Sequence, residues 1–411
     1  MCRTDSQNPA PKKYSRVPRM HSHVKIALNR IPAAAKIIAL ILVAGLCLHP
    51  TVARAQLPVP TYGWNLGNTL DATWPGAPMP TQTLINNVAA AGFNTIRIPC
   101  AWDHNADPTT HQINASYMAT VMQTVQWAQA AGLTVVINDH WDGGWFENSN
   151  FNRLNSSVNK KLVSYWTQIA NNFKNYDSKL LFAIANEPAV TSQAQTTVLM
   201  KYYQNAVNAI RATGGNNSTR WLVLQGPGGS NIDDTNNWVT TLPTDPAGHL
   251  AFEVHYYSPY QYALMTADAT WGSMWYFWGS GYHSSQLPTR NATASTEESY
   301  VAAEFEKMYS QFTSRGIPVI LGEFGAIRRS GTSGLAGTSL DLHLASRTYF
   351  DKYIVEQANS LGIRPIYWDD SDNGTGNNAF GIFNRSTGVL VGTDDARALT
   401  GGAALAPPPG G

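Results

Sequence analysis

The chain has 411 residues, of which 43% are hydrophobic, 11% are aromatic and only 13% are charged. The formal net charge of +1 gives no electrostatic reason to expect a nucleic-acid or anionic-lipid partner. The length allows one large domain or two ordinary ones.

The N-terminal region has the pattern of a secretory signal peptide. Basic residues precede the apolar run 37–48, and Ala53-Arg54-Ala55 fits the small-x-small cleavage rule. We therefore expect an N-terminal extension and signal peptide over 1–55, cleavage before Gln56, and secretion to the extracellular space or the periplasm. A membrane anchor is the alternative, but the run 37–48 is too short to cross roughly 30 Å of hydrocarbon, so we expect no stable membrane insertion.

Cysteine usage restricts how the secreted chain can be stabilised. Cys2 and Cys47 lie in the predicted signal region, which leaves Cys100 as the cysteine of the mature chain. An internal disulfide and a cysteine-based metal site are then both excluded. We expect Cys100 to be a buried, unreactive thiol, and a large hydrophobic core to supply the stability.

From residue 61 onward, β-rich runs alternate with helical patterns. The runs have largely apolar interiors without clean alternation, as expected for strands that are covered on both faces. They lie at 61–68, 93–100, 133–140, 180–187, 220–227, 250–259, 318–324 and 364–371. Between them, helical patterns such as Leu162, Trp166, Ile169, Ala170 and Phe173 place apolar residues on one face.

Eight such units predict a single (β/α)8 TIM barrel, with its active site at the C-terminal ends of the strands. Four helices are predicted to end at a glycine directly before a strand, at 92, 132, 316 and 362. A doubly wound open sheet is the competing architecture, but no glycine-rich phosphate loop follows the first strand. We place the catalytic domain at 56–399.

Two segments stand apart from the alternating pattern. The connection 259–296 is long and aromatic, and long connections in compact domains are usually functional. We expect the tryptophans at 271–278, together with Trp141 and Trp145, to form sugar-stacking subsites, with a place in the core as the alternative reading. The Gly/Ala/Pro-rich tail 400–411 is predicted to be a disordered end or a linker stub.

Polar residues follow or end most of the predicted strands, where a barrel gathers its active site. They are Asn65, Arg97, His140, Asn186, Glu187, His255, Tyr257, Glu323 and Trp368. Glu187 and Glu323, at the ends of the fourth and seventh predicted strands, would face each other across the barrel mouth. Two carboxylates about 5–5.5 Å apart hydrolyse a glycosidic bond with retention, one as acid/base and one as nucleophile.

Seven motifs resemble glycoside hydrolase family 5, the family of retaining barrel hydrolases that includes bacterial endo-β-1,4-glucanases. The resemblance covers roughly 60–395, which is almost the whole of the expected mature chain. The motifs are GWNLGNTLDA (63–72), NTIRIP (94–99), NDHW (138–141), ANEP (185–188), VHYYSPY (254–260), GEFG (322–325) and IYWDD (366–370).

The resemblance implies a role for each matching residue. Glu187 matches the acid/base and Glu323 the nucleophile. Asn186 matches the asparagine that bonds the sugar 2-hydroxyl, and Arg97 and Tyr257 match groups that hold the nucleophile ionised. The remaining expected substrate-binding residues are His140 and His255 around the cleavage-point sugar, Trp368 beneath that sugar, and Asn65 and Trp141.

Some positions depart from the commonest family pattern and leave the substrate open. Asp139 stands where an apolar residue is frequent, and Trp141 where a second histidine often sits. The acidic run at 369–372 is predicted to be a solvated rim rather than a calcium loop.

We predict a secreted, monomeric, retaining endo-β-1,4-glucanase that acts on cellulose-like β-glucans and needs no cofactor and no metal. Within the family, the alternatives are a xyloglucanase, a mixed-linkage β-glucanase and a β-mannanase. Outside that group, the alternatives are a non-catalytic carbohydrate-binding protein and a metal-dependent barrel hydrolase. The metal-dependent hydrolase is weak because the expected mature chain lacks the His-x-His and His-Glu-x-x-His spacings typical of metal sites.

Overall fold

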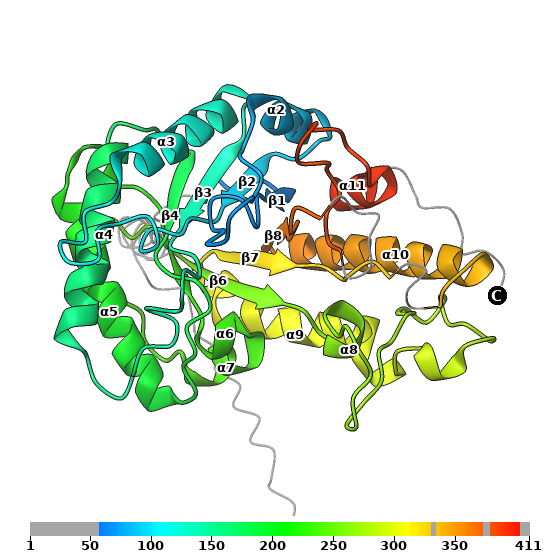
Figure 1. The fold of residues 1–411 in the computed structure, drawn as a ribbon. Helices are drawn as coiled ribbons and strands as arrows, with labels where there is room; N and C mark the ends of the chain where they lie inside the picture. The colour runs from blue at the N-terminus through cyan, green and yellow to red at the C-terminus, as the bar shows by residue number, and fades with distance from the viewer. Residues whose placement is uncertain (1–56, 330–333, 373–378, 403–411) are drawn as a thin grey trace, which may run out of the picture. The chain divides into compact units, whose positions relative to one another are not determined.

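The computed structural model describes residues 57–329, 334–372 and 379–402. Within these ranges, eight parallel strands form a closed barrel in chain order, with β8 paired to β1 (Figure 1). This confirms the predicted (β/α)8 barrel. The predicted signal peptide over 1–55 and most of the predicted tail lie outside the described residues. None of the described helices is both long and apolar enough to cross a bilayer.

All eight predicted strands form, although each is shorter than predicted. Their bounds are β1 Gly63–Asn65, β2 Thr95–Ile98, β3 Thr134–Asn138, β4 Leu180–Ala183, β5 Leu222–Gln225, β6 Leu250–Tyr256, β7 Val319–Phe324 and β8 Arg364–Tyr367. The prediction that Glu187 ends the fourth strand is wrong, because β4 stops at Ala183. The chain turns after the strand, and Glu187 has a φ of 44° that does not fit a β-ladder.

Helices pack around the barrel and join its strands (Figure 1). They are α2 Gln82–Ala90, α3 Ala115–Ala130, α4 Ser156–Phe173, α5 Gln193–Ala212, α6 Pro227–Ser230, α7 Ile232–Trp238, α8 Tyr260–Ala263, α9 Glu298–Gln311, α10 Thr338–Ser360 and α11 Thr393–Leu399. Short 3₁₀ turns occupy Gly215–Ser218, Pro288–Arg290, Ala294–Thr296 and Thr313–Arg315. The four glycines predicted to precede strands all have a positive φ, between 71° and 100°.

The hydrophobic core has two layers because each strand is covered on both faces. The larger layer lies between strands and helices, and the apolar face predicted for α4 is buried there, from Leu162 to Phe173. The smaller layer includes alternate strand residues such as Val136, Leu181 and Ile320. Leu57 and Val59 belong to this inner cluster, so the chain enters the fold by packing against strand residues of the barrel.

Part of the aromatic connection after β6 belongs to the core, which corrects the predicted sugar-stacking role for Trp278. Phe277 and Trp278 are fully buried. Arg329, which follows β7, is also fully buried and donates hydrogen bonds to backbone carbonyls of this connection, including those of Met265 and Trp275. These bonds fold the connection back on itself. Trp271 differs, since it is 65% exposed.

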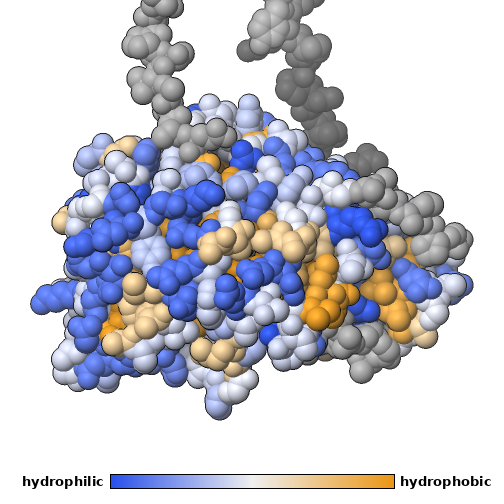
Figure 2. Space-filling view, turned by 90° about the horizontal axis from the view of Figure 1, so that it is seen from above, coloured by the Kyte–Doolittle hydropathy of each residue, from blue (hydrophilic) through white to orange (hydrophobic). Residues whose placement is uncertain are grey.

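The space-filling view shows one face of the molecule, on which hydrophilic residues predominate (Figure 2). Strongly hydrophobic residues appear there in small separate groups. This pattern suits a protein whose polar surface is supplied mainly by uncharged side chains, since only 13% of the residues are charged.

Candidate active site

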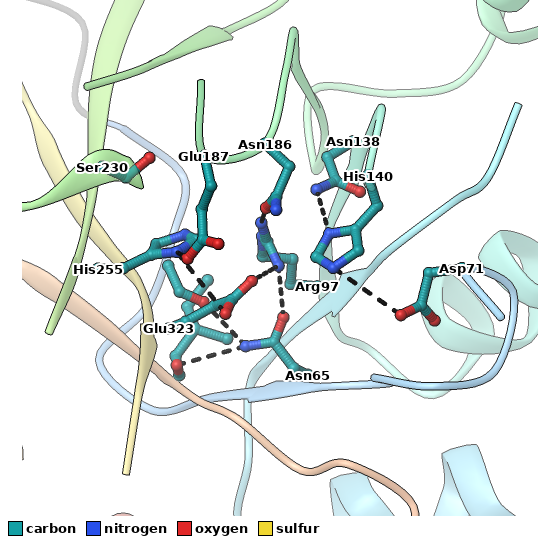
Figure 3. A network of polar contacts seen from close by, with 12 residues as sticks. Asn65, Asp71, Arg97, Asn138, His140, Asn186, Glu187, Ser230, His255 and Glu323 are labelled. Atoms are coloured by element: carbon teal, nitrogen blue, oxygen red, sulfur yellow. Dashed lines mark hydrogen bonds and ion pairs between the residues drawn. The ribbon is translucent and has the colours of Figure 1, made fainter. Parts of the chain in front are cut away.

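A fully buried arginine gathers the polar residues at the C-terminal end of the barrel. Arg97 on β2 donates from Nη1 to Glu323 Oε1 and to Asn65 Oδ1, both at 2.9 Å, and from Nη2 to Asn186 Oδ1 at 2.8 Å (Figure 3). Asn65 is oriented in turn, because its amide donates to the Gly322 carbonyl at 2.8 Å. Asn65 and Arg97 are both 0% exposed, so their partners are other protein groups. They therefore hold the more exposed site residues in position.

The two predicted glutamates meet above this arginine. Glu323 lies on β7 and is 5% exposed, whereas the Glu187 side chain, from the loop after β4, is 40% exposed. One carboxylate oxygen of each and a ring nitrogen of His255 lie within 4.8 Å of one another (Figure 3). Glu323 Oε2, the oxygen that Arg97 does not bind, accepts a hydrogen bond from the Tyr257 hydroxyl at 3.1 Å.

His255 on β6 stands between the two carboxylates. Its Nδ1 lies 2.6 Å from Glu187 Oε1 and 3.6 Å from Glu323 Oε2. The pairing register of β6 and β7 shifts between Val254 and His255, which brings His255 directly opposite Glu323. Burial opposes a charge on the imidazole, but Glu323 and the hydrogen bond to Glu187 overcome it and raise the pKa of His255 to about 10.

The charge on Glu323 is set by opposing influences. Burial raises the pKa of its carboxyl group, and the positive charges of His255 and Arg97 act against that rise. The hydrogen bonds from Arg97 and Tyr257 also favour the carboxylate, which can accept at both oxygens. No guanidinium within the described ranges makes such a contact with Glu187, so the two glutamates occupy chemically different environments.

His140 and Trp368 form a second wall of the site. Their rings stack with centroids 5.7 Å apart and an interplanar angle of 10°. The Asn138 amide donates to His140 Nδ1 at 3.0 Å, which leaves Nε2 to carry the proton that faces Asp71, 3.8 Å away (Figure 3). Burial lowers the pKa of His140 well below its ordinary value, so this imidazole is neutral.

Trp141 differs from the other predicted site residues in its exposure to solvent. It is 46% exposed, and its ring lies over Gly144, where an added Cβ would come within 2.6 Å of the indole. Trp145 is only partly buried and packs against the main core and against Tyr165, with ring centroids 5.7 Å apart.

Sequence reasoning missed several residues of the network. Glu253, Gln225 and Ser230 are fully buried and connected to one another through hydrogen bonds. The position of Glu253 two residues before His255 in a strand, and hence on the same face, was the signal that could have revealed it.

The prediction of a solvated acidic rim is wrong for Asp369. This carboxylate is 0% exposed, pairs with Arg385 at 2.8 Å and accepts a hydrogen bond from the Trp64 indole at 3.1 Å. The guanidinium of Arg385, which follows 16 residues later in the chain, therefore compensates the burial of this carboxylate. Cys100 is buried and free, as predicted.

A model of the family described as "Cellulase (glycosyl hydrolase family 5)" matches residues 56–374. The chain belongs to glycosyl hydrolase family 5. It is therefore a glycoside hydrolase, and the family resemblance seen in the sequence is confirmed.

Three similar proteins illustrate the range of this family 5 group. Endoglucanase B of Clostridium cellulovorans is 33% identical over 79% of this chain and 69% of its own length. XEG5B, a xyloglucan-specific β-1,4-glucanase from a ruminal metagenomic library, is 36% identical with a TM-score of 0.74, over 84% of this chain and 95% of that one. A broad specificity endoglucanase from Bacteroides salanitronis is 31% identical with a TM-score of 0.71, over 83% and 92%. The chain spans only 61% and 62% of two further relatives.

Beside the site of this family 5 chain lies a group of buried acids. Burial, then Asp142 and Glu147, raise the pKa of Asp139 well above its ordinary value, and no described residue forms a hydrogen bond with either Asp139 oxygen. Burial also raises the pKa of Asp142 to about 7 and that of Glu147 to about 8. These groups bind protons more tightly in the folded than in the unfolded chain.

We expect Asp139→Asn to raise the Tm at pH 7 by roughly 2 °C or more. Because the pKa of Asp139 is raised on folding, the folded state loses stability as the pH rises from the ordinary aspartate pKa through the raised one. The asparagine does not titrate, so the Tm of the variant should fall less steeply between pH 4 and 8. Scanning calorimetry over this range measures the effect.

The exposed substitution Asp394→Asn serves as the control and should leave this pH slope unchanged. A lower Tm for Asp139→Asn at pH 7 would show instead that the ionised carboxylate is stabilising.

Proposed function

We propose that the chain is a retaining endo-β-1,4-glucanase that hydrolyses internal bonds of β-glucans through Glu187 and Glu323. The observation that carries the proposal is the convergence of one oxygen from each carboxylate within 4.8 Å. Retaining glycosidases hold their carboxyl groups about 5–5.5 Å apart, whereas inverting enzymes need roughly 6.5–9.5 Å to admit a water molecule. The spacing supports retention.

The different surroundings of the two glutamates support their separate roles. Glu323 is buried and accepts hydrogen bonds from Arg97 and Tyr257, which suits a nucleophile that must remain ionised. Glu187 is half exposed and contacts His255, which suits a group that exchanges a proton with a leaving group and then with water.

The reaction follows in two displacements. The Glu323 carboxylate attacks the anomeric carbon while Glu187 gives its proton to the departing glycosidic oxygen, so one C–O bond breaks and a glycosyl ester forms. Glu187, now ionised, takes a proton from water, and the resulting hydroxide attacks the same carbon. The ester bond breaks, Glu323 leaves as a carboxylate, and Glu187 is again protonated.

The remaining residues of the site would hold the sugar at the reaction centre. Asn186 is fixed by Arg97 and stands beside Glu187, where its amide would bond a sugar hydroxyl. Trp368, stacked on the neutral His140, offers an apolar ring face to a pyranose. Trp141 is exposed and would meet a more distant sugar unit.

A second candidate substrate is xyloglucan. The similar protein XEG5B, described as xyloglucan-specific, is 36% identical to this chain, which is more than the 33% of the Clostridium endoglucanase. The relatives thus include both kinds of specificity, and the catalytic core does not separate them.

Removing either glutamate should abolish most of the activity. We expect Glu187→Ala to lower kcat roughly 10²–10⁴-fold, the usual contribution of a positioned acid/base, and Glu323→Ala to leave near-background rates. Azide with an aryl β-glucoside substrate distinguishes the roles. It should yield the β-glycosyl azide with Glu187→Ala and the α-glycosyl azide with Glu323→Ala, as product NMR would show. Wild-type rates in either variant would contradict the proposed two-glutamate mechanism.

The substrate proposal predicts a ranking of initial rates. Carboxymethylcellulose and barley β-glucan should be cleaved internally, with a rapid fall in viscosity for each reducing end released. Xyloglucan and mannan complete the panel. A strong preference for xyloglucan would establish the second candidate, and a strong preference for mannan would contradict the glucanase assignment.

We further propose that the protein is secreted after cleavage before Gln56. The apolar run 37–48 and the sequence Ala53-Arg54-Ala55 support this. Expression of the full chain in a bacterium should give extracytoplasmic protein whose intact mass corresponds to residues 56–411. A cytoplasmic product that retains residues 1–55 would contradict the proposal.

A further inference from the structure

We propose that Glu253 is a positioning residue for this site, which fixes the proton-bearing nitrogen of His255 and, through two further contacts, holds both reacting glutamates in place. The inference rests on the proposed roles of Glu187 and Glu323. Glu253 itself does not touch the substrate, since its side chain is fully buried on β6 beneath the reacting groups.

One oxygen of Glu253 contacts nitrogen atoms of three residues: it is hydrogen-bonded to Gln225 and His255, and it forms an ion pair with Arg97. Oε1 lies 3.1 Å from Arg97 Nε, 3.1 Å from His255 Nε2 and 2.7 Å from Gln225 Nε2. The backbone makes room for this arrangement at Gly322, where an added Cβ would lie 2.0 Å from the same oxygen. The carboxylate is therefore built into the barrel as a shared acceptor.

Each of these three residues also contacts a different part of the reaction centre. Arg97 donates a hydrogen bond to Glu323, and His255 contacts the Glu187 carboxylate. Gln225 contacts the Glu187 backbone, because Gln225 Oε1 accepts from the Glu187 amide at 2.6 Å. Glu187 is thus held at two points, and its positive φ of 44° is supported by one of them.

The orientation of the Gln225 amide follows from its other partners. Its Oε1 accepts from both the Glu187 amide and the Ser230 hydroxyl, so its Nε2 is the end that donates to Glu253. The same Nε2 lies 3.3 Å from His255 Nε2 and cannot accept a proton from it. Glu253 is consequently the acceptor for His255 Nε2.

This assignment fixes the chemistry of the imidazole. With Nε2–H donated to Glu253, the nitrogen that gains or loses a proton is Nδ1, 2.6 Å from Glu187 Oε1. Nδ1 accepts from Glu187 when Glu187 is protonated and donates to it when Glu187 is ionised. The pair therefore shares one proton in both halves of the reaction.

The charged groups that surround His255 make the effect of Glu253 predictable. Glu187 faces it from the loop after β4, Glu323 from β7 and Glu253 from its own strand, while Arg97 contributes positive charge from β2. Gln225 on β5 is neutral, and His140 also interacts with His255 electrostatically but is itself neutral. Removing the negative charge of Glu253 should therefore lower two pKa values: that of the proton shared by His255 and Glu187, and that of the Glu323 carboxyl group.

The test is Glu253→Gln, which keeps the shape of the side chain and removes its charge. We expect kcat to fall roughly 10- to 100-fold, as for loss of one charge-assisted hydrogen bond, with KM little changed. The alkaline limb of the kcat/KM profile should move to lower pH by about one unit or more. Glu304→Gln is the matched control, because Glu304 is also a buried carboxylate but pairs with Lys307 on α9.

A purely structural ion pair to Arg97 predicts a different result. In that case Glu253→Gln lowers Tm but leaves the pH limbs in place, and this outcome would overturn the proposal. Unchanged kcat would do the same. Failure of the proposed function is distinguishable, because it appears as full activity in Glu187→Ala.

A measurement on the unaltered enzyme covers the case in which Glu253→Gln does not fold. In ¹⁵N-histidine-labelled protein, with the His255 signals assigned by their loss in His255→Gln, Nε2 should remain protonated from pH 5 to 9. A neutral His255 protonated at Nδ1 anywhere in this range would refute the assignment.

Discussion

The active site depends on a buried positive charge at the end of β2. Arg97 is fully enclosed, and a guanidinium in such a place is tolerated only when acceptors surround it. Glu253, Glu323 and two amide oxygens, those of Asn65 and Asn186, meet that requirement. Since these acceptors come from four different parts of the barrel, satisfying one cation also places the proposed nucleophile Glu323 and the amide of Asn186 that is proposed to bind the sugar.

Negative charge near this arginine exceeds what a single cation can balance. Three carboxylates gather within reach of Arg97 and His255, and for Glu253 and Glu323 burial alone would raise the pKa and favour the neutral form. The protein resolves the excess by leaving Glu187 half exposed and by burying Glu253 and Glu323 against cations. The same difference in exposure gives the two proposed catalytic glutamates different chemical environments, so the charge balance of the site and the proposed reactivity have one origin.

The sequence predicts well what is repeated or local, and poorly what joins distant segments. The eight strands and the Glu187–Glu323 pair follow from runs of apolar residues that end in polar ones. Glu253 escaped notice because its strand reads as a buried run, in which a single acid carries no information about its partners. Asp369 was misread because its counter-ion, Arg385, comes from a separate segment. The aromatic connection was misread for the same reason, since Arg329 folds it from another loop.

The contact between Asp369 and Arg385 also bears on where this catalytic unit ends. The family match stops at residue 374, yet Arg385 lies beyond it, with its guanidinium 4.5 Å from the Trp64 ring. Through Asp369 and Trp64, this later segment braces β1 and the turn that carries Trp368. A boundary drawn by sequence similarity would therefore cut through a buried ion pair. For domain exchange or fusion, we therefore expect a unit that extends through α11 to be the one that keeps this ion pair intact.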